Sequence, residues 1–225
     1  TVILEWKNIE NRIYGDGQGA IKGVVYCLEH DSGLVSAEIE GADLTAGTHT
    51  ARVTRLTGEK AGNYKLPENP TYTYTVAKAK QTLEFKASAT EVTYDENIII
   101  DNKLKETSNY STTVIYDSSN PKVVTVDNDG SSHVVGVGTA TITATAVETE
   151  NYERAQATWT VTVTPKPVTI SGIKVENKTY NGTTAASIDL SNAKIDGGVS
   201  YTLQIDATNA KAVFKDANAG TDKTV

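Results

Sequence analysis

The cluster Asp127-Asn128-Asp129-Gly130 has the residue types that metal binding requires. Calcium accepts carboxylate and amide oxygens at alternate positions, so Asp127 and Asp129 are the candidate metal ligands of the chain. A complete calcium loop also needs a glutamate at a set distance, and none stands there. An Asp-Gly pair between two apolar runs is typical of a hairpin turn, where glycine supplies a positive φ. We therefore interpret the cluster as a turn and expect no metal site.

The three histidines and the single cysteine are the other residues that could ligate a metal or attack a substrate. His30, His49 and His133 stand in separate contexts, whereas zinc needs three or four convergent ligands. Cys27 follows an apolar run, with no base beside it to activate the thiol. These patterns predict a buried structural thiol and no zinc site. A disulfide within the chain is excluded.

The glycine-rich stretch Gly15-Asp16-Gly17-Gln18-Gly19 has the composition of a phosphate-binding loop. It lacks the Lys-Ser/Thr pair and the following helix whose backbone N–H groups would hold a phosphate. A β-turn is the better interpretation. The chain also has no Gly-x-Ser-x-Gly nucleophile motif. We therefore expect no catalytic residues, no cofactor-binding residues and no enzymatic activity.

The overall charge and hydropathy narrow the range of partners. With 21 basic and 28 acidic residues the net charge is −7, and no basic stripe exists that could contact phosphates. We expect no binding to nucleic acid, because such binding needs clustered Lys and Arg. No apolar run is long enough to span a bilayer. The chain has no methionine, which predicts a fragment or a processed product.

The stretch Gly136 to Pro167 reveals the fold class. Ala140, Ile142, Ala144 and Ala146 alternate with threonines, and Trp159, Val161 and Val163 alternate with threonines again after a polar bend. Since side chains along a strand point to opposite faces, each strand has one apolar and one polar face. This pattern favours an all-β chain of antiparallel β-sandwiches.

Two motifs recur along the chain. Asn63-Tyr64 and Asn151-Tyr152 each precede a long alternating strand, at an offset of 88 residues, from 63 to 151. A tyrosine also precedes a turn-forming cluster at each of three positions: Tyr14-Gly15-Asp16-Gly17, Tyr94-Asp95-Glu96-Asn97 and Tyr180-Asn181-Gly182-Thr183. Periods this long indicate tandem small domains. We predict three units, 1–78, 79–165 and 166–225, in an elongated arrangement.

The third unit lacks the closing motif and the closing strand of the other two, which predicts that it is truncated. Its short apolar runs still predict strands, among them Ser200 to Ile205.

Exposed aromatic rings could bind sugars, and eleven tyrosines are present. Tyr72 and Tyr74 share the face that also carries Val76, so we expect both to pack in the core.

Several of these motifs resemble known families. Val114 to Pro121, Val123 to Asp127 and Val135 to Ala144 are similar to the bacterial immunoglobulin-like group 2 domain. The first unit resembles the MBG repeats of bacterial surface proteins, through Trp6, Tyr14 to Gly17, Ala46 to Thr50 and Asn63 to Pro67. The third resembles the YDG repeats, through Tyr180 to Thr184 and Asn218 to Thr221. These resemblances imply a secreted or wall-attached bacterial protein with its domains in series as a stalk.

The expected function is therefore that of a non-catalytic spacer or adhesive stalk, located outside the cell and monomeric within a longer chain. One alternative is a module that binds carbohydrate or a host or cell-surface protein. It would need a contiguous patch of exposed aromatic residues at one end of a sandwich. Another is an accessory region of a secreted glycosidase. No cofactor is expected in any of these cases.

Overall fold

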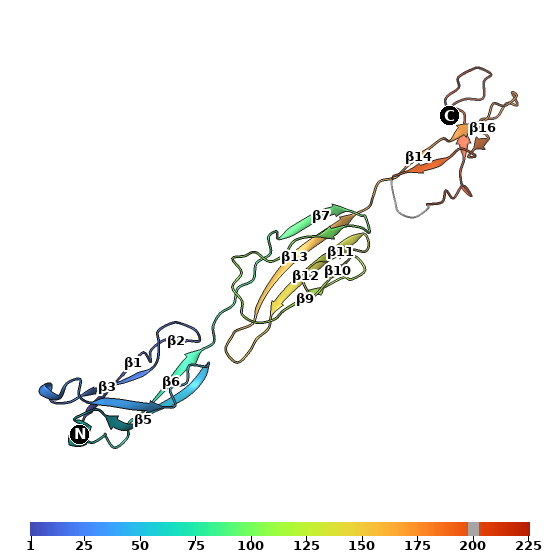
Figure 1. The fold of residues 1–225 in the computed structure, drawn as a ribbon. Coiled ribbons are helices and arrows are strands. Elements are labelled where there is room, and N and C mark those ends of the chain that lie inside the picture. The colour runs from blue at the N-terminus through green and yellow to red at the C-terminus, as the bar shows by residue number, and fades with distance from the viewer. Residues whose placement is uncertain (198–202) are drawn as a thin grey trace.

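The computed structural model describes residues 1–197 and 203–225. In these ranges the regular structure consists of strands and two short 3₁₀ helices, η1 (Glu29–Asp31) and η2 (Ala61–Asn63). No helix within them has the length and apolar character needed to cross a bilayer. Figure 1 shows the sheets as three groups in a row, with the two termini at opposite ends. The all-β, elongated architecture predicted from the sequence is confirmed.

The N-terminal segment (residues 1–78) contains a four-stranded sheet and a two-stranded one. The larger sheet has the order β2-β6-β5-β4, with β2 at Arg12–Ile13, β6 at Thr71–Ala77, β5 at Gly47–Thr57 and β4 at Ser36–Glu40. The smaller sheet pairs β1 (Ile3–Lys7) with β3 (Lys22–Tyr26). The buried cluster of the N-terminal segment consists of Ile21, Ala51, Tyr74 and Val76.

The central segment (residues 79–165) is a sandwich of two sheets. The larger has the order β7-β13-β12-β9, with β7 at Ala89–Thr93, β13 at Ala155–Thr164, β12 at Gly138–Ala146 and β9 at Val114–Ser118. The smaller has the order β10-β11-β8, with β10 at Val124–Val126, β11 at Ser132–Val134 and β8 at Ile99–Ile100.

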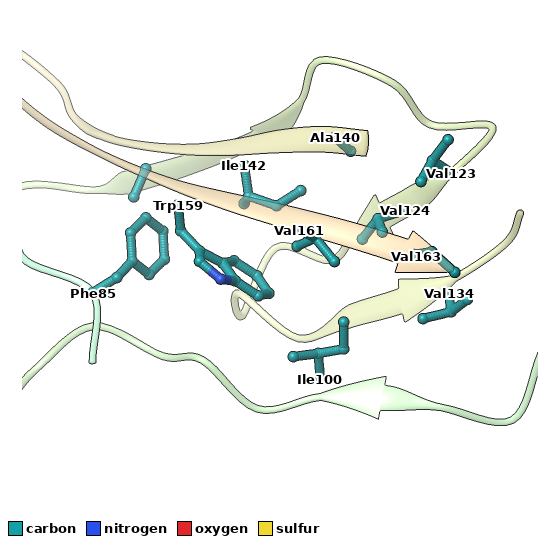
Figure 2. Packing of buried hydrophobic residues seen from close by; sticks show 11 residues of the cluster. Phe85, Ile100, Val123, Val124, Val134, Ala140, Ile142, Trp159, Val161 and Val163 are labelled. Carbon is teal, nitrogen blue, oxygen red and sulfur yellow. The ribbon is translucent and has the colours of Figure 1, made fainter. Parts of the chain in front are cut away.

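Side chains from both central sheets form one core (Figure 2). Trp159 is 1% exposed, and its ring centre lies 5.9 Å from that of Phe85. The predicted apolar faces are confirmed: the even-numbered residues of β12 from 140 to 146 are buried, as are Trp159, Val161 and Val163 of β13. Ala155 and Ala157 of the same face are half-buried, since β13 begins at the rim of the core.

One edge strand in each large sheet runs parallel to its neighbour. β7 pairs in parallel with β13, and β2 pairs in parallel with β6. A parallel pair needs a long connection between its strands, and the rest of each segment provides one. An early strand of each segment, β2 or β7, thus lies beside the long strand that closes the segment, β6 or β13. The remaining ladders are antiparallel, as the alternation of residues predicts.

The C-terminal segment (residues 166–225) has three separate two-stranded ladders. They pair β14 (Thr169–Ser171) with β18 (Lys194–Asp196), β15 (Lys174–Val175) with β17 (Ile188–Asp189), and β16 (Ala185–Ala186) with β19 (Ala212–Val213). No side chain is buried in 166–197 or 203–225, so the described part shows ladders without a packed core. The predicted strand Ser200 to Ile205 begins outside the described residues, and its last three residues are irregular.

Candidate functional site

The two candidate metal ligands lie in the turn between β10 and β11. Gly130 has a φ of +86°, and Asp129 Oδ1 accepts a hydrogen bond from Ser131 N at 2.9 Å. Asp127 Oδ2 lies 2.8 Å from Nε2 of His133, a pairing that the sequence interpretation missed. In the described ranges no group of three or more His, Cys, Asp or Glu side chains is placed to hold a metal ion. Both carboxylates thus make contacts that shape the hairpin.

The other histidines and the cysteine occupy separate places in the N-terminal segment. His30 is largely exposed beside Asp31, whereas Nε2 of His49 lies 2.7 Å from the Thr45 carbonyl oxygen. Cys27 is half-buried, not buried as predicted, because it follows the last residue of β3. The structure therefore does not bring these side chains together.

The glycine-rich stretch wraps around a guanidinium group. Arg12 is 4% exposed, and its Nη1 donates to the carbonyl oxygens of Asn8 and Gly19, both at 2.9 Å. Its Nε lies 3.0 Å from Asp16 Oδ2, as an ion pair without the angle of a hydrogen bond. The loop surrounds a fixed positive charge, which supports its interpretation as a structural turn.

The tyrosine-turn motif has the same local structure in all three segments. The Oδ1 atoms of Asp16, Asp95 and Asn181 each accept a hydrogen bond from the backbone N–H two residues later, at 2.9, 3.0 and 3.2 Å. This is the Asx turn, in which a side chain replaces a backbone carbonyl. In the first motif Gly15 separates Tyr14 from the aspartate and adopts a φ of +74°. The motif is thus a local folding element with an acidic side chain in two of its three copies.

The two acidic turns should respond to acid, whereas the third should not. Amide donation by Gln18 lowers the pKa of Asp16, and donation by the Asn97 amide, followed by a hydrogen bond from Lys166 Nζ, lowers that of Asp95. A pKa lowered by folding gives stability that is present above the unfolded value of about 3.9 and lost as the pH falls through the folded value. We expect the amide resonances of residues 18 and 97 to titrate with midpoints below about 3.9 in NMR. The Thr183 amide, bonded to Asn181, should show no such step. Midpoints at or above the ordinary value would contradict this.

The Asn-Tyr loops hold the chain that enters their own segment. In the loop of residues 147–154, the Asn151 carbonyl accepts from Ala79 N, and Glu153 N donates to the Ala79 carbonyl, both at 2.9 Å. In the N-terminal segment, Val2 N donates to the Lys65 carbonyl at 3.0 Å. Lys65 and Glu153 correspond at the 88-residue offset. The repeated motif therefore has a repeated structural role.

The 147–154 loop also contacts the preceding segment. Asn151 Oδ1 accepts a hydrogen bond from Ala46 N at 2.8 Å, and the rings of Tyr14 and Tyr152 meet edge to face with their centres 5.3 Å apart. Lys78 Nζ donates to the Thr149 carbonyl at 2.9 Å. In Figure 1 this loop joins β12 to β13 at the end next to the N-terminal segment.

Gln81 connects the two ends of that loop. It is 7% exposed, and its Nε2 donates to the carbonyl oxygens of Val147 and Glu153 at 3.3 and 2.8 Å. Its Oε1 accepts from Ser111 N and Thr112 Oγ1, both at 3.0 Å. One buried amide thus meets four partners. No recurring motif in the sequence marks it.

Two aromatic predictions can be compared with the structure. Tyr74 is buried as expected, but Tyr72 is 39% exposed and lies 6.0 Å from the ring of Trp6. The expectation of core packing was wrong for Tyr72, because β6 begins at the rim of the sheet.

A cavity of about 600 Å³ in the C-terminal segment is lined by Tyr180 and Phe214 among other residues. Tyr180 is 66% exposed, and Lys178 Nζ lies over the Phe214 ring.

Family models match two parts of the chain. The model of the YDG domain matches residues 164–225, and that of the intimin immunoglobulin-like domain matches residues 100–148. The chain combines an immunoglobulin-like repeat of the bacterial surface type with a YDG-like region. Both matches fall where the sequence motifs predicted domains of these kinds. No curated protein matches the chain by sequence.

Solved structures give weaker likenesses. Domains 4 and 5 of the S-layer protein SbsC match at 18% identity, over 72% of this chain and 98% of theirs, with a TM-score of 0.30. A C-terminal fragment of intimin, in complex with the intimin-binding domain of its translocated receptor, matches at 14% identity. The match covers 76% of this chain and 66% of the fragment, with a TM-score of 0.28. A SusE-like surface polysaccharide-binding protein from Bacteroides thetaiotaomicron matches at 13% identity, over 63% of this chain and 37% of its own, with a TM-score of 0.26. With scores this low, we take the fold from the strand order and the family matches.

Proposed function

We propose that this chain is a non-catalytic spacer or adhesive stalk of a bacterial cell-surface protein, exposed outside the cell. Its modules would be residues 1–78, which are MBG-like, residues 79–165, which are immunoglobulin-like, and residues 166–225, which are YDG-like and incomplete. The observation that carries the proposal is the pair of separate buried clusters in series, one around Tyr74 and Val76 and one around Trp159. Each cluster stabilises its own sheets, so the chain gains length with each module.

The residues whose types could bind a ligand or catalyse a reaction have structural roles instead. Asp16 and Asp129 accept hydrogen bonds within their own turns, and Arg12 is enclosed by the glycine-rich loop. The family matches to a YDG domain and to an intimin immunoglobulin-like domain agree with a surface protein. Binding of a receptor or of polysaccharide belongs to the structural neighbours and is not needed for the spacer role.

Small-angle X-ray scattering tests the spacer role. A compact globule of this length would have a radius of gyration of about 17 Å. We expect a clearly larger value, with a distance distribution that has a long tail, because the sheets lie in a row. The measurement needs a monodisperse sample, which light scattering verifies. A radius near that of the globule would refute the spacer role.

Glycan binding is the second candidate, favoured by the cavity that contains Tyr180 and Phe214. An exposed aromatic face beside polar side chains such as Asp216 is suited to a sugar ring. If this function is correct, a glycan array should show hits that Tyr180→Ala abolishes. Tyr26→Ala is the matched control, because Tyr26 is 50% exposed in the N-terminal segment, away from the cavity. Binding unchanged in Tyr180→Ala, or no hits at all, would leave the spacer role alone.

A further inference from the structure

The two motifs that recur along the sequence meet at the joint between the first two segments. Tyr14 opens the first tyrosine turn, and Asn151-Tyr152 is the second Asn-Tyr pair. Their tyrosine rings form the edge-to-face contact at 5.3 Å, with an angle of 77° between the planes. Such pairs are favoured beyond the area they bury. Each motif already has a role within its own segment, so this meeting is a second role that neither motif alone reveals.

The N-terminal side of the joint is held in place by contacts within its own segment. Asp43 Oδ1 accepts from Thr45 N at 2.8 Å, and the hydroxyl of buried Tyr74 donates to the Asp43 carbonyl. His49 Nε2 also contacts the Thr45 carbonyl. These contacts fix the turn that presents Ala46 N to the central segment. The donor is therefore preorganised for an acceptor on another segment.

The central side is equally fixed. Gln81 bonds the carbonyl oxygens at both ends of the 147–154 loop, and Ala79 pairs with the middle of the loop. Asn151 uses its backbone carbonyl for Ala79 and its side chain for Ala46. Asn151 thus bonds both the linker and the neighbouring segment, on a loop whose two ends are bridged by Gln81.

The linker itself leaves little freedom. Ala77 is paired with Ile13 in the N-terminal sheet, and Ala79 is bridged to Tyr152 in the central segment. Lys78 alone stands between these two pairings, and its Nζ bonds the Thr149 carbonyl and Glu148. Contacts on both sides of a one-residue connection restrict both bending and rotation between the segments.

We propose that the 147–154 loop is a docking surface for the tyrosine-turn end of a preceding module of the same kind, and that it fixes the angle between the two. The partner is a β-module that presents an aromatic ring and a free backbone N–H, as Tyr14 and Ala46 do. This inference rests on the proposed spacer function and adds that the spacer is rigid between its first two segments. The repeated motifs are then the two complementary halves of a joint.

Double electron–electron resonance between spin labels tests the joint in the full chain. Labels at the exposed positions Thr73 and Thr158, in a Cys27→Ser background, report the distance between the first two segments. We expect a narrow distance distribution, whose width at least doubles in the Asn151→Ala/Tyr152→Ala double variant. Asn63→Ala is the matched control: the same residue of the same motif, exposed and remote from the joint.

The outcomes separate the joint from the spacer function. A broad distribution in the unsubstituted chain, or equal widths in the double variant and in Asn63→Ala, overturns the joint. If scattering still shows an elongated particle in that case, the spacer function stands. Circular dichroism verifies folding of each variant. Should the double variant fail to fold, Tyr14→Ala removes the same ring contact from the other side, and an unchanged width there overturns the proposal.

Discussion

Replacing Trp159 with alanine is expected to destabilise the central segment by about 3–5 kcal/mol, since large cavities in packed cores cost this much. Trp159 is 1% exposed, packs against Phe85, and donates from Nε1 to Thr90 Oγ1 at 3.0 Å. Native-state hydrogen exchange measures the effect strand by strand. Amides of β12 and β13 should lose about two to four orders of magnitude of protection. The N-terminal strands should keep theirs, because their buried cluster is separate.

The matched control for this change is Ile115→Ala. Ile115 lies on β9 of the same sheet but is 56% exposed, so its truncation leaves no cavity. A change within about 0.5 kcal/mol is expected. Equal loss of protection in the N-terminal strands of Trp159→Ala would show that the two clusters unfold as one unit, and would contradict the modular interpretation.

The core of the central segment is the part of the fold that the sequence predicts best. A two-residue period maps directly onto a pleated strand, so alternation with threonine identified the buried faces of β12 and β13 without other information. The Asp-Gly pair likewise predicted the hairpin at Gly130, because glycine adopts the positive φ of a tight turn without steric cost. These are local signals, and they depend on few neighbours.

Tertiary contacts account for what the sequence did not predict. Tyr72 and Tyr74 have the same parity on β6, yet only Tyr74 reaches the core, since burial also depends on where along the strand the other sheet lies. Asp127 and His133 meet only because the hairpin register places Thr125 opposite His133. The buried position of Arg12 follows from a loop that closes over it. None of these features leaves a periodic signal.

The joint shows the same limit at longer range. The repeats revealed the Asn-Tyr and tyrosine-turn motifs, but not that Tyr14 and Tyr152 touch. Recurrence shows that a motif matters, whereas its partner depends on how one segment is placed against the next. Gln81 is the extreme case, because the sequence has no feature that distinguishes this buried polar residue at the start of the central segment from an exposed one.

Gln81→Leu is therefore the most informative test of the polar contacts in the central segment. Leucine fills a similar space but removes the donor to the Glu153 carbonyl oxygen and the acceptor of the Ser111 N–H, whereas the Val147 carbonyl keeps its hydrogen bond from Thr112 Oγ1. Each buried polar group without a partner costs about 1–3 kcal/mol, and we expect a loss of about 2–4 kcal/mol in a urea titration. The amides of Ala79 and Ser111 should also lose protection against hydrogen exchange, because Ala79 N donates to the loop at Asn151 and Ser111 N donates to Gln81 itself.

Gln156→Leu provides the comparison. Gln156 lies on the exposed face of β13, where its Nε2 donates to Thr145 Oγ1, so the same substitution should change stability by no more than about 0.5 kcal/mol. If Gln81 merely occupied space, leucine would be neutral or stabilising at both positions. A selective loss at Gln81 would show that the loop is held by hydrogen bonds. A loosened loop would then broaden the Thr73–Thr158 distance distribution even with Asn151 and Tyr152 intact, which links the stability of the central segment to the rigidity of the joint.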